Sequence, residues 1–446
     1  MNKSDIVYFI ESFLPKRFID WHRENKARKT PRYQLWKEQK EIYKKEVERL
    51  SSVDRPYNVV FLVLYASVWK YDSLYRLMEK DPRFNPLILV CPVVDRGYEH
   101  MIENLKPTYD MFKQKGYNVL CAYDENNKTY IEVPDLKPDI IFFAYQYANH
   151  TDNRYSENTL KNYLKCYVNY SYKNNPNVWS IASQFHGLMW QYYSECEDNK
   201  KFIQSVSAWE FNNVRVVGYP MYDEFIQTEE KGINWKLKDN RQRKRIIWAP
   251  HHTIDGNDMY IKLSTFLLYS DFMLEVAKKY RDVAQFVFKP HPQLKPALYN
   301  HPDWGKKKTD EYYDKWEKGE NTNYVSGDYV DLFKSSDAMI HDCHSFTVEY
   351  LYTQKPVLFL TNYDREIQCN EVGKKAFACH YHGTTKTDVI RFIDNVVLGE
   401  KDSMLKLRRN FYESILVPPH GLSVAENIIN EILKEINKCD LCKQKN

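Results

Sequence analysis

The sequence predicts an α/β protein built from two nucleotide-binding-type domains, with a helical N-terminal arm. The chain has 446 residues, which is too long for one ordinary core and suits two domains of about 150–200 residues each. Hydrophobic residues make up 43% of the chain and aromatic residues 15%, enough to fill two cores. Short apolar runs alternate with helix-compatible stretches, which is typical of βαβ units whose parallel sheet is covered on both faces.

Residues 1–52 are expected to form the helical arm. Apolar side chains recur every three or four residues in Ile6–Leu14, and a second helical stretch runs over Tyr33–Leu50. Residues 1–50 carry 13 Lys and Arg against 8 Asp and Glu, a surplus of positive charge. Two interpretations stay open: the arm rests on an anionic membrane surface, or it packs on the first domain.

Residues 53–230 are predicted to form the first α/β domain. Its strands are continuous apolar runs and its helices are the polar, periodic stretches between them. The expected strands are 58–64, 86–90, 118–121, 139–143, 178–181 and 214–218, with helices at 71–80 and near 98–115.

Residues 231–415 are predicted to form the second α/β domain, after a polar, Lys-rich segment at 226–244 that we interpret as a linker. Residues 416–446 are expected to add a closing helix and a tail. Two such domains bind ligands at the carboxyl ends of their strands. The expected strands are 245–249, 285–289, 338–340 and 356–360, and the expected helices are 263–280, one from Ser345, 385–397, 402–414 and 424–438.

Composition and motifs exclude several classes of protein. A net charge of +4 among 124 charged residues gives no reason to expect a nucleic-acid partner. No apolar run reaches the roughly 20 residues that span a bilayer, and the N-terminus lacks a signal peptide, so a cytoplasmic protein is expected, at the inner membrane face if the arm binds lipid. The chain has neither a dinucleotide fingerprint nor a P-loop.

No metal or cofactor is expected from the sequence. The nine cysteines are scattered, and the close pair Cys439-x-x-Cys442 has no second pair beside it. No D-x-D stands at a strand end to hold a metal-bound diphosphate. A phosphorylated ligand would therefore be bound by His, Lys, hydroxyls and helix N-termini.

Such groups follow the predicted strands of the second domain. In Lys289-Pro290-His291-Pro292 two prolines restrict the backbone around one imidazole, which suits contact with a phosphate or a leaving group. A buried strand runs into His341-Asp342-Cys343-His344-Ser345 and then into a helix, whose N-terminus favours phosphate. A turn or cap without a ligand is the structural alternative for each segment. The other candidate donor-binding residues are His251, His252, Thr347 and Glu349.

The first domain offers one candidate for acid–base chemistry. His186-Gly187 is expected just after the strand at 178–181, where His186 is placed as a general base for an acceptor hydroxyl. A structural histidine is the alternative.

Together these segments resemble the CDP-glycerol glycerophosphotransferase family, GT-B transferases of two facing Rossmann-like domains that build teichoic-acid and capsule polymers. Members carry, in order, H-G, G-x-P-x-x-D, A-P-T, K-x-H-P, S-D-x-L-I-T-D-Y-S-S and K-P segments. The chain carries counterparts in the same order between about residues 180 and 360: His186-Gly187, Gly218–Asp223, Ala249-Pro250-His251, Lys289–Pro292, Ser336–Ser345 and Lys355-Pro356.

The resemblance implies roles for these residues. His186 would be the acceptor-side base, His291, His344 and Ser345 would hold the donor diphosphate, and Glu349 would lie near the ribose. The chain departs from the pattern in three places: it lacks the Lys after H-G, it has His251-His252-Thr253 where A-P-T-x-Arg is usual, and His341–Ser345 replaces T-D-Y-S-S.

The expected function is transfer of a polyol phosphate from a CDP-activated donor to a hydroxyl of a cell-surface glycan or lipid-linked acceptor. Three alternatives stay open. One is a GT-B glycosyltransferase using CMP-Kdo or a UDP-sugar. Another is a UDP-sugar epimerase of the same fold, and the last is a non-catalytic binding subunit.

Overall fold

The computed structural model describes residues 28–146, 148–237, 243–254, 263–361 and 368–443. The predicted arm therefore lies outside the described residues up to position 27. Contacts divide the chain into two compact units. The first unit comprises residues 1–171, 177–220 and 418–446, and the second comprises 172–176 and 221–417.

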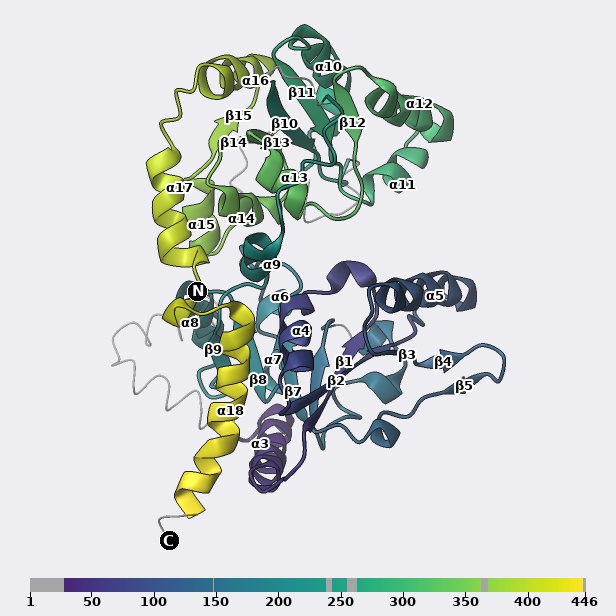
Figure 1. The fold of residues 1–446 in the computed structure, drawn as a ribbon, viewed down its shortest axis with the longest axis vertical. Helices are drawn as coiled ribbons and strands as arrows, with labels where there is room; N and C mark the ends of the chain where they lie inside the picture. Colours follow the sequence, from purple (N-terminus) through teal and green to yellow (C-terminus); the bar gives the residue numbers. More distant parts are fainter. Residues whose placement is uncertain (1–27, 147, 238–242, 255–262, 362–367, 444–446) are drawn as a thin grey trace, which may run out of the picture. The chain divides into compact units, whose positions relative to one another are not determined.

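The first unit is built on a seven-stranded parallel sheet with the order β3-β2-β1-β6-β7-β8-β9 (Figure 1). Counted along the chain, the order begins 3-2-1-4-5-6, that of doubly wound nucleotide-binding folds. The central strands are apolar on both faces because helices cover both sides. The strands are β1 Tyr57–Val63, β2 Phe84–Val90, β3 Val119–Cys121, β6 Ile140–Phe143, β7 Leu164–Val168, β8 Gln191–Ser194 and β9 Val214–Val216.

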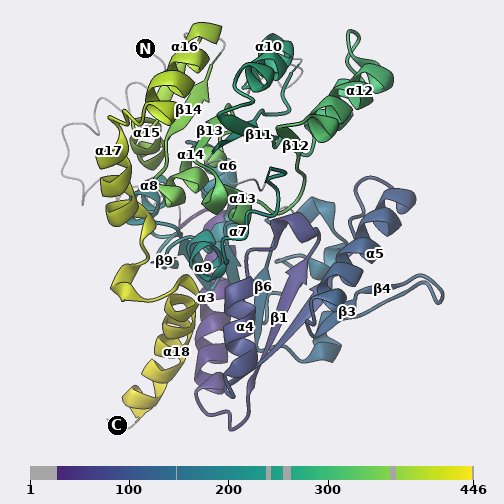
Figure 2. The same ribbon diagram turned by 45° about the horizontal axis from the view of Figure 1, so that its top comes forward.

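Helices from both ends of the chain pack together in this unit. Helix α3 (Pro31–Leu50) begins with the N-cap Thr30 followed by proline. The last helix, α18 (Val424–Lys443), contacts α3 and α4 (Asp72–Lys80), as Figure 1 and Figure 2 show. The predicted closing helix is thus part of the first unit, together with α5 (Tyr98–Gln114).

In the first unit one strand assignment is wrong and two strands were not predicted. Residues Val178–Ile181 form the short helix α6 rather than a strand. Its N-cap Asn177 accepts a hydrogen bond from the Trp179 backbone N–H, and the Trp179 side chain is 82% exposed. The strands of this region are β7 and β8, which the sequence pattern does not reveal. Strand β7 contains Lys165, whose ammonium is fully buried and donates to Gln39 Oε1 at 3.0 Å.

The second unit is built on a six-stranded parallel sheet with the order β12-β11-β10-β13-β14-β15. This is again the 3-2-1-4-5-6 order, so its topological switch point lies between β10 and β13. Both sheets confirm the predicted α/β class. The strands are β10 Lys244–Ala249, β11 Ala284–Phe288, β12 Thr322–Tyr324, β13 Ala338–His341, β14 Val357–Leu360 and β15 Tyr381–Gly383.

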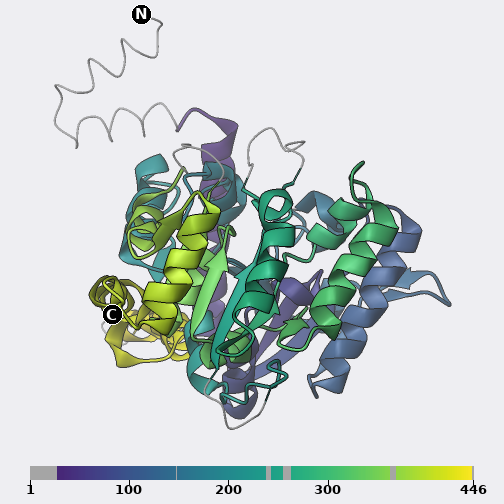
Figure 3. The same ribbon diagram turned by 90° about the horizontal axis from the view of Figure 1, so that it is seen from above.

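Three helices cover one face of this sheet, and Figure 3 looks onto them. They are α10 (Phe266–Lys279), α12 (Gly305–Lys318) and α16 (Lys386–Arg391), which π-helical turns extend to Leu398. Their side chains share one core with Trp248 and Phe288 of the sheet. The remaining helices of the unit are α9 Met221–Gln227, α11 Leu294–Tyr299, α13 Val330–Ser335, α14 Phe346–Glu349, α15 Glu371–Phe377 and α17 Leu405–Phe411.

The segment interpreted as a linker is partly packed into the second unit. The Asp331 carboxylate accepts hydrogen bonds from the backbone N–H groups of Lys231, Gly232 and Ile233. The Trp235 side chain is buried, and its indole N–H donates to Ser335 Oγ at 2.9 Å. Residues 231–235 are therefore a fixed part of the unit. In the described part of the chain, no helix combines the length and apolar character that crossing a bilayer requires.

Candidate active site

The loops that follow β10, β11 and β13 meet at the switch point of the second unit. β10 pairs in parallel with β11 on one side and β13 on the other, so the three carboxyl ends lie at one edge. Backbone hydrogen bonds join the first two loops: Lys289 N donates to Trp248 O, and His291 N donates to Pro250 O at 3.0 Å. This edge is where doubly wound sheets bind their ligands.

Three imidazoles gather there, His251 and His252 after β10 and His291 after β11. The ring centroids lie 4.3 Å apart for His251 and His252, 4.2 Å for His252 and His291, and 5.1 Å for His251 and His291. All three side chains are half-buried. The sequence predicted each histidine as a donor ligand, but the close packing of the three, hereafter the histidine trio, is a structural finding.

Local contacts fix the Nδ1 side of two of the rings, those of His291 and His251. His291 Nδ1 accepts a hydrogen bond from the Gln293 backbone N–H at 3.1 Å. A neutral imidazole that accepts at Nδ1 carries its proton on Nε2, so His291 presents an N–H donor. His251 Nδ1 contacts Thr253 Oγ1 at 3.0 Å, so Nε2 is the nitrogen of this ring that the Thr253 contact does not involve.

His251 and His291 are uncharged at neutral pH. Burial, reinforced by the neighbouring imidazoles, lowers the pKa of His251 to about 2. Burial lowers the pKa of His291 to about 4, with further contributions from His252 and Lys289. Neutral rings donate hydrogen bonds to an anionic ligand without contributing a formal charge. The nearby cation is Lys289, which is 4% exposed.

Asp342 ties the β13 loop to the β10 loop. Its side chain is buried and accepts hydrogen bonds from His251 N, Thr265 N and Thr265 Oγ1, the last at 2.8 Å. Burial raises the pKa of this carboxyl to about 6, against the effect of those hydrogen bonds. Asp342 thus positions the backbone that carries His251, and its carboxylate is occupied by protein groups.

The remaining candidates after β13 divide into two sets. His344 and Ser345 are half-buried at the start of α14. His341 points into the interior, is fully buried, and packs against Phe359 and His380. Thr347 and Glu349 are also buried: Thr347 Oγ1 donates to Cys343 O at 3.2 Å, and Glu349 accepts from the Tyr329 hydroxyl at 2.7 Å. Donor binding by His341, Thr347 and Glu349 stays a prediction, and in this structure their side chains serve the fold.

Asn174 is a site residue that the sequence did not suggest. It belongs to the short segment 172–176 of the second unit. Its Nδ2 donates to His344 O at 2.7 Å, and its Oδ1 lies 3.4 Å from His344 Nδ1. Its backbone oxygen accepts from Asn370 N at 3.1 Å, and the close approach requires glycine at 373, where a Cβ would lie 2.1 Å from that oxygen.

His186 of the first unit has a different environment. It lies in the short helix α7 (Gln184–Gly187) and is fully buried. Its Nδ1 accepts from the Ser183 backbone N–H at 3.1 Å, and its Nε2 faces Gln146 Oε1 at 3.1 Å. The proton therefore lies on Nε2, which is the tautomer opposite to the one a base at Nε2 needs. The role of His186 as acceptor-side base stays a prediction.

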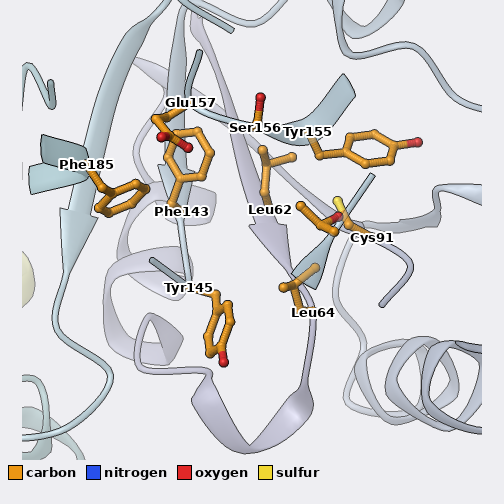
Figure 4. Close-up of a pocket in the computed structure, with 10 residues that line it drawn as sticks. Leu62, Leu64, Cys91, Phe143, Tyr145, Tyr155, Ser156, Glu157 and Phe185 are labelled. Atoms are coloured by element: carbon orange, nitrogen blue, oxygen red, sulfur yellow. The ribbon is translucent and has the colours of Figure 1, made fainter. Parts of the chain in front are cut away.

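A small pocket lies in the first unit, at the carboxyl ends of β1 and β6 (Figure 4). Its walls include Leu62, Phe143 and Phe185, with Glu157 at one side. A volume of about 20 Å³ accommodates a water molecule but no sugar or nucleotide. The pocket therefore offers no acceptor site in this conformation.

Comparisons with known proteins agree with the resemblance seen in the motifs. A family model described as CDP-glycerol:poly(glycerophosphate) glycerophosphotransferase matches residues 168–414, more than half of the chain. No curated protein sequence matches the chain significantly.

Solved structures show the same architecture at low sequence identity. The Staphylococcus aureus MnaA–UDP complex is 15% identical, with a TM-score of 0.56 over 85% of this chain and 97% of that one. A variant of the wall teichoic acid polymerase TagF is 13% identical, with a TM-score of 0.55 over 91% of this chain and 94% of that one. A TagF variant soaked with CDPG is 13% identical, with a TM-score of 0.52 over 92% and 98% of the two chains. These likenesses confirm the predicted GT-B class.

Proposed function

This chain belongs to the CDP-glycerol:poly(glycerophosphate) glycerophosphotransferase family, and from that premise we propose that it transfers a polyol phosphate from a CDP-activated donor to a hydroxyl of a cell-surface glycan or lipid-linked acceptor. The chain is a transferase by its family. The donor class is supported by the family description and by the TagF variant soaked with CDPG. The acceptor hydroxyl is part of our proposal.

The observation that carries the proposal is the histidine trio at the switch point. A donor diphosphate needs hydrogen-bond donors where negative charge develops on the leaving group. His291 presents Nε2–H, because its Nδ1 is held by Gln293 N, and the positive charge of Lys289 lies beside it. His344 and Ser345 complete the proposed phosphate site at the start of α14.

The proposed reaction is a displacement at phosphorus. The acceptor oxygen forms a bond to the polyol-bearing phosphorus, and the bond from that phosphorus to the bridging oxygen breaks. The electron pair of the broken bond leaves with CMP, whose new negative charge the His291 N–H and Lys289 stabilise. The acceptor proton passes to a base, and the other product is a phosphodiester. We propose that this transfer needs no metal or cofactor.

His186 is the proposed base, and its present contacts set a condition on that role. Nε2 accepts a proton only after the ring has moved its own proton to Nδ1. The Ser183 N–H occupies Nδ1 at 3.1 Å, and Gln146 Oε1 occupies Nε2. The Ser183 and Gln146 contacts must therefore rearrange when the acceptor binds. Apo geometry of this kind does not exclude a catalytic histidine.

We further propose that the enzyme works in the cytoplasm at the inner face of the cell membrane. A lipid-linked acceptor would be presented there, and the basic surplus in residues 1–50 suits an anionic surface. Binding of the full chain to vesicles with and without anionic lipid tests this placement. Equal binding to neutral vesicles, or no binding to either, would count against it.

A donor panel tests the proposed function. The full chain is incubated with an acceptor extract and with CDP-glycerol, CDP-ribitol, a CMP-sugar or a UDP-sugar, and the released nucleotide is identified. We expect CMP with a phosphorus-containing polymer from a CDP-polyol. Release of UDP with sugar incorporation would replace the proposal by a glycosyltransferase, and conversion of a UDP-sugar without acceptor would replace it by an epimerase.

A further inference from the structure

The histidine trio has the composition of a metal site as well as that of a phosphate site. One ligand nitrogen from each of His251, His252 and His291 lies within 4.8 Å of the other two. Within the described part of the chain, they are the only group of three or more His, Cys, Asp or Glu side chains arranged closely enough to hold a metal ion. His291 lies 39 positions after His252 along the chain, so the sequence alone does not show that the three rings pack together.

Two of the three imidazoles are departures from the family motif. His251 stands at the Thr of A-P-T, and His252 follows it, whereas His291 belongs to the K-x-H-P segment. Binding a phosphate does not require three adjacent rings, because Lys289 and the start of α14 also supply hydrogen-bond donors. Three adjacent imidazoles are, however, the protein ligand set of several zinc sites.

The geometry requires only a small adjustment. Zinc–nitrogen distances of 2.0–2.1 Å place tetrahedral ligands about 3.3 Å apart. The nitrogens of the trio lie within 4.8 Å of one another, so they must approach by at most about 1.5 Å, which ring rotation in half-buried loop residues provides. Coordination through His291 Nε2 moves the ring proton to Nδ1 and breaks the Gln293 N–H contact. One short-range hydrogen bond is a small loss beside three metal–nitrogen bonds.

The surroundings supply the support that metal-binding histidines require. Thr253 Oγ1 contacts His251 Nδ1 at 3.0 Å and orients that ring. The Asp342 carboxylate holds the His251 backbone N–H and places negative charge behind the trio. The positive charge of Lys289 opposes a cation, so the two buried charges offset one another. The fourth position of a tetrahedral ion would remain open to water or a phosphate oxygen.

We propose that His251, His252 and His291 bind one divalent transition-metal ion of the zinc class, and that the bound ion inhibits transfer. Inhibition rests on the proposed function: a metal-bound Nε2 has no proton left to donate to the leaving group. The binding itself does not rest on it.

Metal binding is measured on the full chain without a polyhistidine tag, in the Cys439→Ser/Cys442→Ser background so that the C-terminal thiols do not contribute. Zn²⁺ is titrated against a chromophoric chelator, and Co²⁺ is used for its tetrahedral d–d absorption. We expect one ion per chain. His252→Asn and His291→Asn should each weaken Zn²⁺ binding by about 100-fold or more, since losing a ligand costs more affinity than losing a group that only hydrogen-bonds to a ligand.

The control variant is His382→Asn, which removes an exposed histidine of the same unit and should leave Zn²⁺ affinity unchanged. Circular dichroism confirms that each variant folds. Absence of stoichiometric Zn²⁺ binding, or equal affinity in His252→Asn and the parent, overturns the metal site. In the transfer assay, Zn²⁺ should inhibit the parent and EDTA should not. A protein that binds Zn²⁺ through the trio but never transfers would retain the site and refute the proposed function instead.

Discussion

His186 of the first unit and His291 of the second both lie in connections that follow parallel strands, yet the protein holds them in opposite ways. His186 is fully buried, and protein groups face both ring nitrogens. His291 is half-buried, and a backbone N–H fixes only its Nδ1. The comparison teaches that the placement of a histidine in a connection between parallel strands does not decide whether its ring is available for chemistry. The partners of each ring nitrogen decide it.

The largest effect on turnover should come from replacing His291, the half-buried histidine of the pair. His291→Ala removes the proposed donor to the leaving group, so turnover with the CDP-polyol should fall by about 1,000-fold. Steady-state CMP release measures it, with His382→Ala as the control. A fall below tenfold would show that His291 is no more available to the donor than His186 is.

The buried histidine should give a smaller loss of turnover, about 100-fold, if it is the base. His186→Ala should reduce kcat while the thermal shift produced by CDP stays that of the parent, because the proposed donor site lies in the other unit. Gln184→Ala, an exposed neighbour in α7, is the control. If His186→Ala loses thermal stability but the folded variant keeps the kcat of the parent, His186 stabilises the fold and takes no part in catalysis.

Replacing Asn174 tests whether the position of His344 matters for binding at the proposed donor site. Asn174→Ala removes the hydrogen bond to His344 O, so the KM for the donor should rise about tenfold with a smaller change in kcat. Asn175→Ala is the control within the same segment. Equal changes in KM and kcat, or no change in either, would show that Asn174 does not contribute specifically to donor binding.

The smallest predicted effect concerns pH and stability. The pKa of His291 is lowered to about 4 by burial, so between pH 6.5 and 4 the unfolded chain binds a proton that the folded chain does not. The contribution of the neutral His291 ring to the free energy of unfolding is therefore fully present above pH 6.5 and is lost as the pH falls toward 4. Over this pH range the free energy of unfolding of His291→Asn should therefore fall by about 2–3 kcal/mol less than that of the parent. Urea unfolding at pH 7 and pH 4.5 measures the difference, and parallel losses would refute it.

The sequence was sufficient to predict the strand ends that carry the candidate site. Strands β10 and β11 are apolar runs that end in proline-containing turns, so their limits and the histidines beyond them are locally encoded. Strand β7 was missed because its buried Lys165 interrupts the apolar pattern, although Gln39 and the Glu157 backbone satisfy that ammonium.

Side-chain direction was less predictable than strand position. His341 and His344 lie three residues apart, and one turns into the core while the other remains half-buried at the loop. Their environments come from Phe359, His380 and Asn174, which are distant in sequence. No local pattern carries that information. The trio has the same origin, since two separate loops bring its members together.

The division of the chain into units has a consequence for synthesis. The polypeptide passes between the units at 171/172, 176/177, 220/221 and 417/418. The first unit is therefore incomplete until α18 emerges from the ribosome, since Ile428, Ile432 and Ile436 of that helix are buried there. A nascent chain must keep the matching surface of α3 and α4 uncovered while the entire second unit is translated, and apolar surface exposed in this way is prone to aggregation.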